Sequence, residues 1–156
     1  MGITARDVMD TSYSTLSPGM TIGEAVRVFQ TAGEEHHQVV FGMVVADAAG
    51  RLVGMLSMYD ILLVIRPKHI HIWGEIMDVD VTGILDEALR RARPMLVEDI
   101  MTTDLITITP DMHLLRIIDI MIKKHVRRLP VLEEGKMVGM VYLSRVFQHL
   151  LGKWSE

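Results

Sequence analysis

The residues best suited to chemistry stand where a predicted strand turns into a helix. Ser57 follows the short apolar run Gly54-Met55-Leu56, and Asp60 comes three positions after Ser57. A strand that turns directly into a helix presents backbone N–H donors, and here also a hydroxyl, at a place where an anion is favoured. A carboxylate one turn later can accept hydrogen bonds from both hydroxyls of a ribose. The pair therefore predicts a binding site for an anion.

Ser57 and Asp60 also have the spacing of a helix capping box. In that interpretation the two side chains satisfy free backbone donors of the helix and touch no ligand. A cap of this kind is worth about 1 kcal/mol of helix stability. Capping and ligand contact can coexist, so both interpretations stay open at this point.

Two adjacent arginines, Arg127 and Arg128, form a second candidate for anion binding. They stand just before the apolar run Leu129-Pro130-Val131, which suits a buried strand. Their planar guanidinium groups match the oxygens of a phosphate, and without an anion between them they repel one another. The alternative is a solvated strand edge, where surface charges contribute little to stability.

Histidines raise the alternative of a metal site. His69 and His71 would lie on one side of an extended segment, and His36 and His37 are adjacent. The chain has no cysteine, and no carboxylate stands at a recognised ligand spacing from either pair. A histidine-dependent metal sensor is therefore kept only as an alternative.

No group of residues argues for catalysis. A serine nucleophile needs a base and a group that orients the base, and neither Ser57 nor Ser144 has such partners in the nearby sequence. We therefore expect that the chain binds a ligand and is not an enzyme.

The candidate residues lie in a unit that the sequence uses twice. The opening Asp7-Val8-Met9 returns as Asp99-Ile100-Met101, and the run Arg51-Leu52-Val53-Gly54-Met55-Leu56 returns as Lys136-Met137-Val138-Gly139-Met140-Val141. Each copy predicts the order short strand, helix, strand, strand, helix. A three-stranded sheet with helices on one side leaves one apolar face uncovered. We therefore expect an α/β (α+β) fold in which the two copies pack sheet to sheet with pseudo-two-fold symmetry.

The repeat predicts two domains, residues 1–65 and 98–152, and an insert at 66–97 that matches neither copy. The insert holds a helical pattern over residues 86–93, which Pro94 stops. Its many apolar residues, and the lack of a Gly/Ser tract, argue against a flexible linker. We therefore expect an ordered excursion between the two copies.

The first long helix of each copy has a predicted cap. Thr21 and Glu24 have the spacing of a capping box at the start of the helix in the first copy. The second copy lacks this box, and we expect Asp111 to cap its helix instead.

Composition limits the class of protein. The chain has 156 residues, 49% hydrophobic content, a net charge of -4 and no cysteine. That length can bury one sizeable core or two small ones. No apolar run approaches the roughly 18 residues that a membrane span needs, and residues 1–10 do not resemble a secretory signal. We therefore expect a cytoplasmic protein that binds no membrane, and the negative charge gives no general attraction to nucleic acid.

The ordered motifs of both copies resemble the cystathionine beta-synthase (CBS) domain family, whose domains occur in tandem pairs often called Bateman modules. The resemblance covers both ends of the chain and leaves out only the insert. The marks that carry it are the two Asp-hydrophobe-Met openings, the steps Ser17-Pro18 and Thr109-Pro110, and the runs His125-Val126-Arg127-Arg128-Leu129-Pro130-Val131 and Gly54-Met55-Leu56-Ser57-Met58-Tyr59-Asp60.

The resemblance implies that an adenosine-containing ligand, such as AMP, ADP, ATP or S-adenosylmethionine, binds in the cleft between the two domains. In the family, the Ser/Thr and Asp of the motif Gly-hydrophobe-hydrophobe-Ser/Thr-x-x-Asp touch phosphate and ribose. Basic residues before a Pro-Val strand face the phosphates, and the first strand of the other domain lines the adenine. On this chain the matching positions are Ser57 and Asp60, then His125, Arg127 and Arg128 before Pro130, and finally Leu105 and Ile106.

The second copy departs from the motif where the first has Ser57 and Asp60. Tyr142 and Arg145 stand at these positions, so a cation replaces the ribose acceptor. We therefore expect at most one good nucleoside site in the chain. The resemblance also favours a homodimer formed through the helices, acting on a regulated protein that the sequence does not identify. The alternative from another class is a ligand-free structural or protein-interaction module, in which Trp73 docks a partner.

Overall fold

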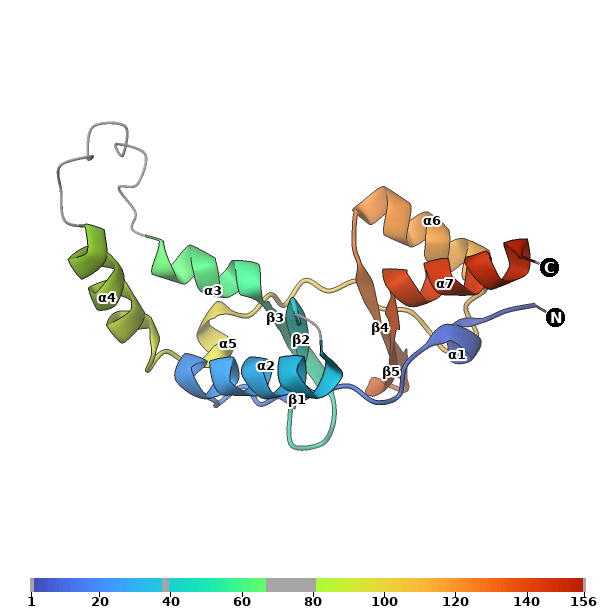
Figure 1. Cartoon of the computed structure of the whole chain (residues 1–156). Coiled ribbons are helices and arrows are strands. Elements are labelled where there is room, and N and C mark those ends of the chain that lie inside the picture. Colours follow the sequence, from blue (N-terminus) through green and yellow to red (C-terminus); the bar gives the residue numbers. More distant parts are fainter. Residues whose placement is uncertain (1, 38–39, 67–80, 156) are drawn as a thin grey trace. The chain divides into compact units, whose positions relative to one another are not determined.

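Helices and short strands alternate along the described part of the chain, which comprises residues 2–37, 40–66 and 81–155 of the computed structural model (Figure 1). This confirms the mixed α and β fold class expected from the sequence. The packing of one sheet on the other stays a prediction.

The chain divides into two compact units that are interleaved along the sequence. The central unit comprises Ser14–Ala48 and Val53–Thr103. The C-terminal unit comprises Asp104–Glu156 and two earlier segments, Met1–Tyr13 and Ala49–Leu52.

The central unit holds a three-stranded sheet with helices packed on it. Its strands are β1 (Thr15–Leu16), β2 (Gly42–Ala46) and β3 (Leu52–Ser57), in that order, and β1 runs parallel to β2. Its helices are α2 (Ile22–His36), α3 (Met58–Ile65), α4 (Val81–Ala92) and α5 (Val97–Ile100). The core joins apolar side chains of strands and helices, among them Leu16, Ile22, Met43, Leu56 and Val97.

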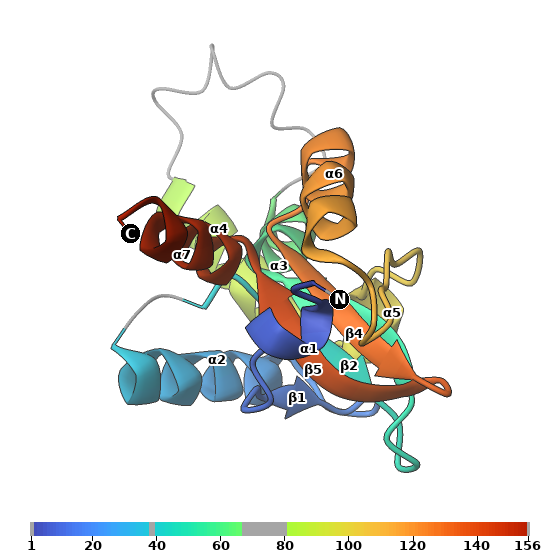
Figure 2. The ribbon, with the colours of Figure 1, turned by 90° about the vertical axis from the view of Figure 1, so that its right-hand side faces the viewer.

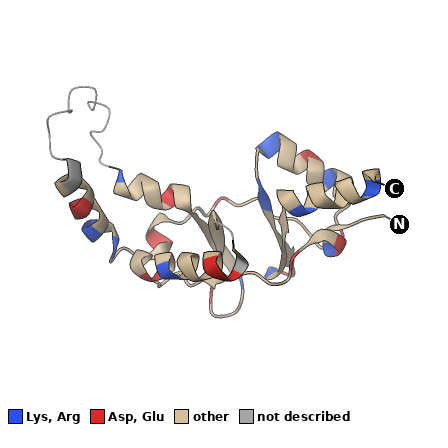
Figure 3. Cartoon of the chain, in the orientation of Figure 1, with Lys and Arg blue, Asp and Glu red and all other residues tan. Residues whose placement is uncertain are grey.

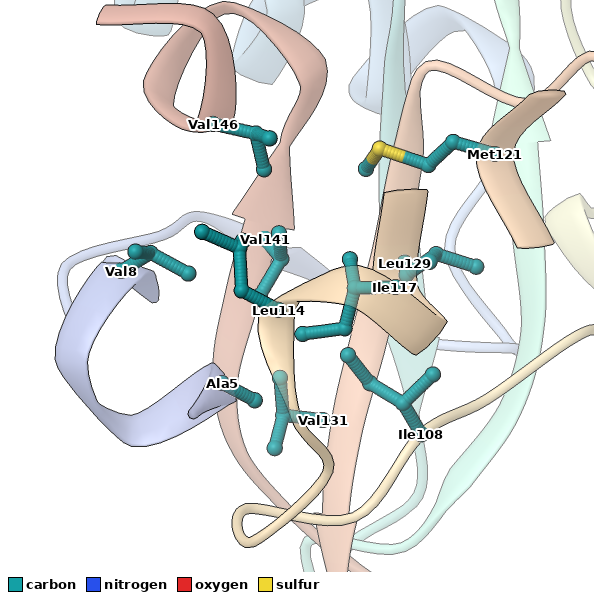
Figure 4. Packing of buried hydrophobic residues seen from close by; sticks show 10 residues of the cluster. All are labelled: Ala5, Val8, Ile108, Leu114, Ile117, Met121, Leu129, Val131, Val141 and Val146. Carbon is teal, nitrogen blue, oxygen red and sulfur yellow. The ribbon is translucent and has the colours of Figure 1, made fainter. Parts of the chain in front are cut away.

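The C-terminal unit is built on an antiparallel hairpin, and its helices lie on one face of that hairpin, in front of it in Figure 2. The strands are β4 (Arg128–Glu133) and β5 (Lys136–Tyr142), and the helices are α1 (Ala5–Val8), α6 (Leu114–Lys124) and α7 (Leu143–Trp154). The buried cluster between helices and hairpin takes side chains from every one of these elements (Figure 4), including Val8, Ile117, Leu129, Val141 and Val146.

The second copy forms two strands where three were expected. Ile108 makes a single parallel bridge to Val131, in the place where the first copy has β1. In both copies a proline follows two residues later, Pro18 and Pro110, and its missing N–H ends the pairing. The three-stranded sheet is therefore confirmed in the first copy and reduced in the second to a hairpin with one bridge.

The opening of the first copy packs on a strand of the second. Helix α1 belongs to the C-terminal unit. Asp10, just after α1, exchanges two backbone hydrogen bonds with Met140 of β5, at 2.8 and 2.9 Å. The Met9 side chain lies against Gly139, where an added Cβ would come within 2.5 Å of Met9 Sδ. The methionine thus occupies the space that a side chain at position 139 would need.

The opening of the second copy makes the equivalent contact in the central unit. Thr102, just after α5, exchanges backbone hydrogen bonds of 2.8 and 2.9 Å with Met55 of β3. Met101 Sδ would lie 2.5 Å from a Cβ added at Gly54. The glycine of each repeated run is therefore explained by a methionine from the opening of the other copy.

The predicted boundaries at 1–65 and 98–152 follow the sequence repeat and differ from the compact units. Helix α1 lies in the first repeat but packs in the C-terminal unit, and α5 lies at the front of the second repeat but packs in the central unit. The sequence repeat gives the position of each copy along the chain. It does not show that each opening segment packs on a strand of the other copy.

Residues 81–97 of the insert include a helix, and an ordered insert over 66–97 stays a prediction. Helix α4 packs on α3, buries Ala88 and Ala92, and ends before Pro94. It begins at Val81 and is therefore longer than the predicted 86–93.

One predicted cap is confirmed and the other is wrong. The Thr21 hydroxyl accepts a hydrogen bond from Glu24 N–H at 3.2 Å, which is one half of the predicted capping box. The Glu24 carboxylate accepts from the Thr21 hydroxyl at 3.0 Å, where a full box has a bond from Thr21 N–H. Asp111 does not cap the helix of the second copy, because α6 begins directly after His113. The His113 Nδ1 atom accepts from Leu115 N–H at 3.0 Å and takes that role.

Candidate ligand-binding site

Ser57 and Asp60 form a complete capping box at the start of α3. Ser57 is the last residue of β3, and its Oγ accepts from Asp60 N–H at 3.0 Å. In return, Ser57 N–H donates to Asp60 Oδ2 at 2.9 Å. The capping interpretation is therefore confirmed. Both side chains are only half-buried, so capping leaves part of each side chain exposed to solvent.

A third residue, which the sequence did not indicate, contacts the same carboxylate. The Thr102 hydroxyl donates to Asp60 Oδ1 at 3.3 Å and to Oδ2 at 3.5 Å. Thr102 is 42 residues away from Asp60 along the chain. It directly follows the opening of the second copy, which packs in the central unit, and its backbone pairing with Met55 brings it to β3. The signal available in the sequence was its place directly after the repeated Asp-Ile-Met opening.

The Asp60 carboxylate keeps acceptor capacity after these contacts. A carboxylate offers about four lone-pair positions. Ser57 N–H uses one of them, and the single Thr102 hydrogen is shared between the two oxygens. The remaining positions match the two hydroxyl donors of a vicinal diol.

The basic candidates lie together where α6 ends and β4 begins. His125 ends α6 in the left-handed conformation, with φ 52°, and its N–H donates to the Met121 carbonyl. The Arg127 carbonyl accepts from Leu143 N–H at 2.8 Å, which ties this corner to the start of α7. His125 and Arg127 are exposed, whereas Arg128 at the start of β4 is half-buried.

Arg128 faces a tyrosine across the hairpin. The strand register pairs Arg128 with Tyr142. Burial lowers the pKa of Arg128 from its usual value, Tyr142 opposes this change and Arg127 adds to it. Burial, and then the charge of Asp10, raise the pKa of Tyr142, while Arg128 acts in the opposite direction. Among the described residues no carboxylate forms an ion pair with either arginine, so the pair is available to an anion.

The remaining predicted residues are apolar and differ in burial. Leu105 and Ile106 are half-buried in the segment that precedes Ile108, and Ile106 packs on the core of the C-terminal unit. Pro130 is fully buried in β4, and its carbonyl accepts from Ile108 N–H at 3.0 Å.

The predicted site residues fall into two groups, one in each compact unit. Ser57 and Asp60 belong to the central unit and gain Thr102 as a neighbour. The residues of the C-terminal unit are Leu105, Ile106, His125, Arg127, Arg128 and Pro130. A joint site formed by both groups stays a prediction.

In the second copy, the equivalent positions carry the opposite chemistry. Tyr142 stands at the start of α7 and makes no side-chain cap, and Arg145 takes the place of Asp60. Asp10 takes the place of Thr102, because each pairs with the equivalent methionine of the repeated run. The carboxylate is thus on the helix in the first copy and on the opening segment in the second.

An apolar groove of about 390 Å³ lies between α6 and α7 on the C-terminal unit. Several side chains on these helices are strongly exposed, including Phe147 at 54%, Ile122 at 67% and Trp154 at 79%. The groove is lined by Ile118, Met121, Ile122, His125, Val126, Arg127, Leu143, Val146, Phe147 and Leu150.

The histidines that raised the alternative of a metal site lie only partly within the described residues. Within the described ranges, no group of three or more His, Asp or Glu side chains could hold a metal ion. His69 and His71, and Trp73, lie outside these ranges, and so does the side chain of His36. No helix among the described residues is long and apolar enough to span a bilayer.

A family model for the CBS domain matches residues 5–67 and 97–152, and the chain belongs to this family. The CBS domain-containing protein YhcV of Bacillus subtilis is 28% identical over 139 residues, which cover 89% of this chain and 79% of YhcV. The uncharacterized protein MJ1225 of Methanocaldococcus jannaschii is 26% identical over 147 residues, or 94% of this chain. The chain spans 42% of the length of MJ1225.

Solved structures of CBS pairs have the same fold. CBSX2 from Arabidopsis thaliana has a TM-score of 0.76 at 21% identity, covering 100% of this chain and 99% of CBSX2. CBSX2 in complex with AMP has a TM-score of 0.72 at 21% identity, with 97% and 98% covered. The cytosolic domain of the Mg2+ channel MgtE in complex with ATP has a TM-score of 0.68 at 24% identity, and the match covers 94% of this chain and 48% of the solved cytosolic-domain chain. The resemblance to tandem CBS pairs is therefore confirmed.

Proposed function

We propose that this chain is a cytoplasmic regulatory module that binds AMP, ADP, ATP or S-adenosylmethionine between its two CBS domains and catalyses no reaction. The observation that carries the proposal is the carboxylate of Asp60. It is held by Ser57 N–H and the Thr102 hydroxyl and retains acceptor positions for the two hydroxyls of a ribose.

The basic residues at the end of α6 and the start of β4 support a ligand that carries phosphate. Arg127 and Arg128 are adjacent, and no ion pair of the described residues neutralises them. Guanidinium groups bind phosphate oxygens through paired hydrogen bonds. In the proposal these two residues and His125 face the phosphates, while Leu105 and Ile106 line the adenine.

The structural relatives support the same class of ligand. CBSX2 was solved with AMP, and the cytosolic domain of MgtE was solved with ATP. The second copy of this chain carries Tyr142 and Arg145 in place of the serine and the carboxylate, so we assign one ribose-binding site to the chain.

The proposal is tested by thermal unfolding with AMP, ADP, ATP, S-adenosylmethionine and NAD. A ligand at a hundred times its dissociation constant stabilises the folded state by about 2.7 kcal/mol. For a chain of this length that corresponds to a rise in melting temperature of about 5 to 10 °C. We expect such a rise with at least one adenosine ligand. If every ligand leaves the melting temperature unchanged, the chain is a structural or protein-interaction module instead.

We also propose that the module forms a homodimer through its helices. Helices α6 and α7 carry five basic residues and one acidic residue, whereas α2 carries three acidic residues and one arginine (Figure 3). Tyr59 and Leu62 of α3, in the same compact unit as α2, are exposed at 69% and 60%. The apolar groove and basic charge of one copy therefore complement the apolar and acidic helices of a second copy.

A charge placed in the groove is expected to separate this dimer. Burying a Phe side chain is worth about 1.5 to 3 kcal/mol, so Phe147→Glu should weaken self-association at least about 10-fold. Light scattering would show twice the chain mass of 17.6 kDa for the native protein and a shift towards the single mass for the variant. Gln148→Glu adds the same charge to the neighbouring exposed position and serves as the control. A native protein that runs at the single mass contradicts the proposal.

A further inference from the structure

We propose that Thr102 is a positioning residue, which orients Asp60 for the two hydroxyls of a ribose and so sets the preference for ribose over deoxyribose. The inference rests on the proposed function. It adds a residue from the second sequence copy to the sugar site of the first.

The carboxylate of Asp60 accepts hydrogen bonds from two donors. Ser57 N–H donates to Oδ2 at 2.9 Å, and the Thr102 hydroxyl is shared between Oδ1 at 3.3 Å and Oδ2 at 3.5 Å. Among the described residues Thr102 is the donor that reaches Oδ1, so its removal lets the carboxylate rotate about its terminal bond. Both oxygens must point correctly to accept two vicinal hydroxyls, whereas one oxygen is enough for a sugar with a single hydroxyl.

Backbone hydrogen bonds to β3 hold Thr102 in its position. Its N–H and C=O both pair with Met55, and Met101 packs against Gly54 in the same strand. The Thr102 side chain is exposed, so its hydroxyl exchanges hydrogen bonds with water in the unfolded chain for one of similar strength and contributes little to folding. The backbone pairing therefore places the Thr102 hydroxyl beside Asp60, where it can orient the carboxylate for a ligand.

The second copy supports the pairing of these two positions. There, the opening segment carries the carboxylate of Asp10 and the helix carries the cation of Arg145. In the first copy the helix carries the carboxylate of Asp60 and the opening segment carries the donor Thr102. The acceptor has changed sides between the copies, and in each copy the partner position offers hydrogen-bond donors. In the second copy the Asp10 carboxylate accepts from Ser12 N–H at 2.9 Å, so the direct contact between the two positions belongs to the first copy.

The test is calorimetric binding of AMP and 2′-deoxy-AMP to the full chain. The native protein should prefer AMP. In Thr102→Val, AMP binding should weaken about five-fold, the value of one net hydrogen bond, while 2′-deoxy-AMP binding changes little. Thr102→Ser should restore the preference, and Thr103→Val, the neighbouring exposed threonine, should leave it unchanged. The melting temperatures of these variants without ligand should match that of the native protein.

Failure of the inference is separable from failure of the proposed function. If the native protein binds AMP and Thr102→Val keeps the same affinity and preference, Thr102 has no positioning role and the proposed function stands. Equal losses for both nucleotides, or no rescue by Thr102→Ser, likewise overturn the inference. If the native protein binds no adenosine ligand, the proposed function is overturned, and the inference with it.

Discussion

Asp60→Asn is expected to weaken AMP binding about a hundredfold while the protein remains folded. Hydrogen bonds to a charged group are worth about 1.5 to 3 kcal/mol, and the substitution removes the charge that both ribose hydroxyls would contact. Asparagine keeps an oxygen that can accept from Ser57 N–H, so the cap of α3 is largely preserved. Calorimetric titration with AMP measures the loss, and thermal unfolding without ligand shows whether the fold is intact.

The chain offers a closely matched control for this substitution. Asp7 caps α1 as Asp60 caps α3, and its Oδ2 accepts from Thr4 N–H at the same distance of 2.9 Å. Asp7→Asn should therefore cost the same cap and leave AMP binding unchanged. If Asp60→Asn binds AMP as the native protein does, or if both variants lose binding equally, the ribose contact assigned to Asp60 is wrong.

Gly139→Val is expected to destabilise the protein by about 3 kcal/mol, the upper part of the range for overpacked interiors. A Cβ at this position would lie 2.5 Å from Met9 Sδ, 2.9 Å from its Cγ and 3.1 Å from its Cβ. The branched side chain must therefore displace the opening segment from β5. For a chain of this length, the melting temperature should fall by about 6 to 12 °C, measured by calorimetry.

Shortening the opposing side chain should reverse part of this effect. Met9→Ala removes the sulfur atom and the Cγ that the valine would meet, so the double variant should be more stable than Gly139→Val alone. Gly19→Val is the control, because nothing lies within 4 Å of a Cβ added there. An unchanged melting temperature for Gly139→Val, or no gain from Met9→Ala, would show that the opening does not pack on Gly139.

Local sequence signals predicted the parts of the site that depend on neighbouring residues. The spacing of Ser57 and Asp60 predicted a strand that turns into a capped helix, and the structure has this turn. Thr102 was missed, because its contact with Asp60 depends on an exchange between the copies and not on sequence spacing. The meeting of Arg127 with the sugar site depends on the packing of two units and is a proposal for the same reason.

The fold was predictable to a similar extent. Hydrophobic periodicity and the repeated glycine runs indicated the long helices and the glycine-containing strands of both copies, whereas the short helices α1 and α5 were not predicted. The periodicity could not show that Ile108 would pair through a single bridge, because strand length depends on which backbone groups find partners. The cap of α6 was assigned to Asp111 by residue preference, whereas the helix starts two residues later than this assignment requires and is capped by His113.

The exchanged openings also limit how such a chain can be divided. A polypeptide with only the first copy would carry α1 without the β5 strand that receives it, and would lack α5 for its own sheet. Such a polypeptide could complete its core only by trading openings with a second molecule, so its folding would be bimolecular and would depend on concentration. Fusion of two copies end to end makes the exchange intramolecular, and the tether keeps the partner permanently at a high local concentration.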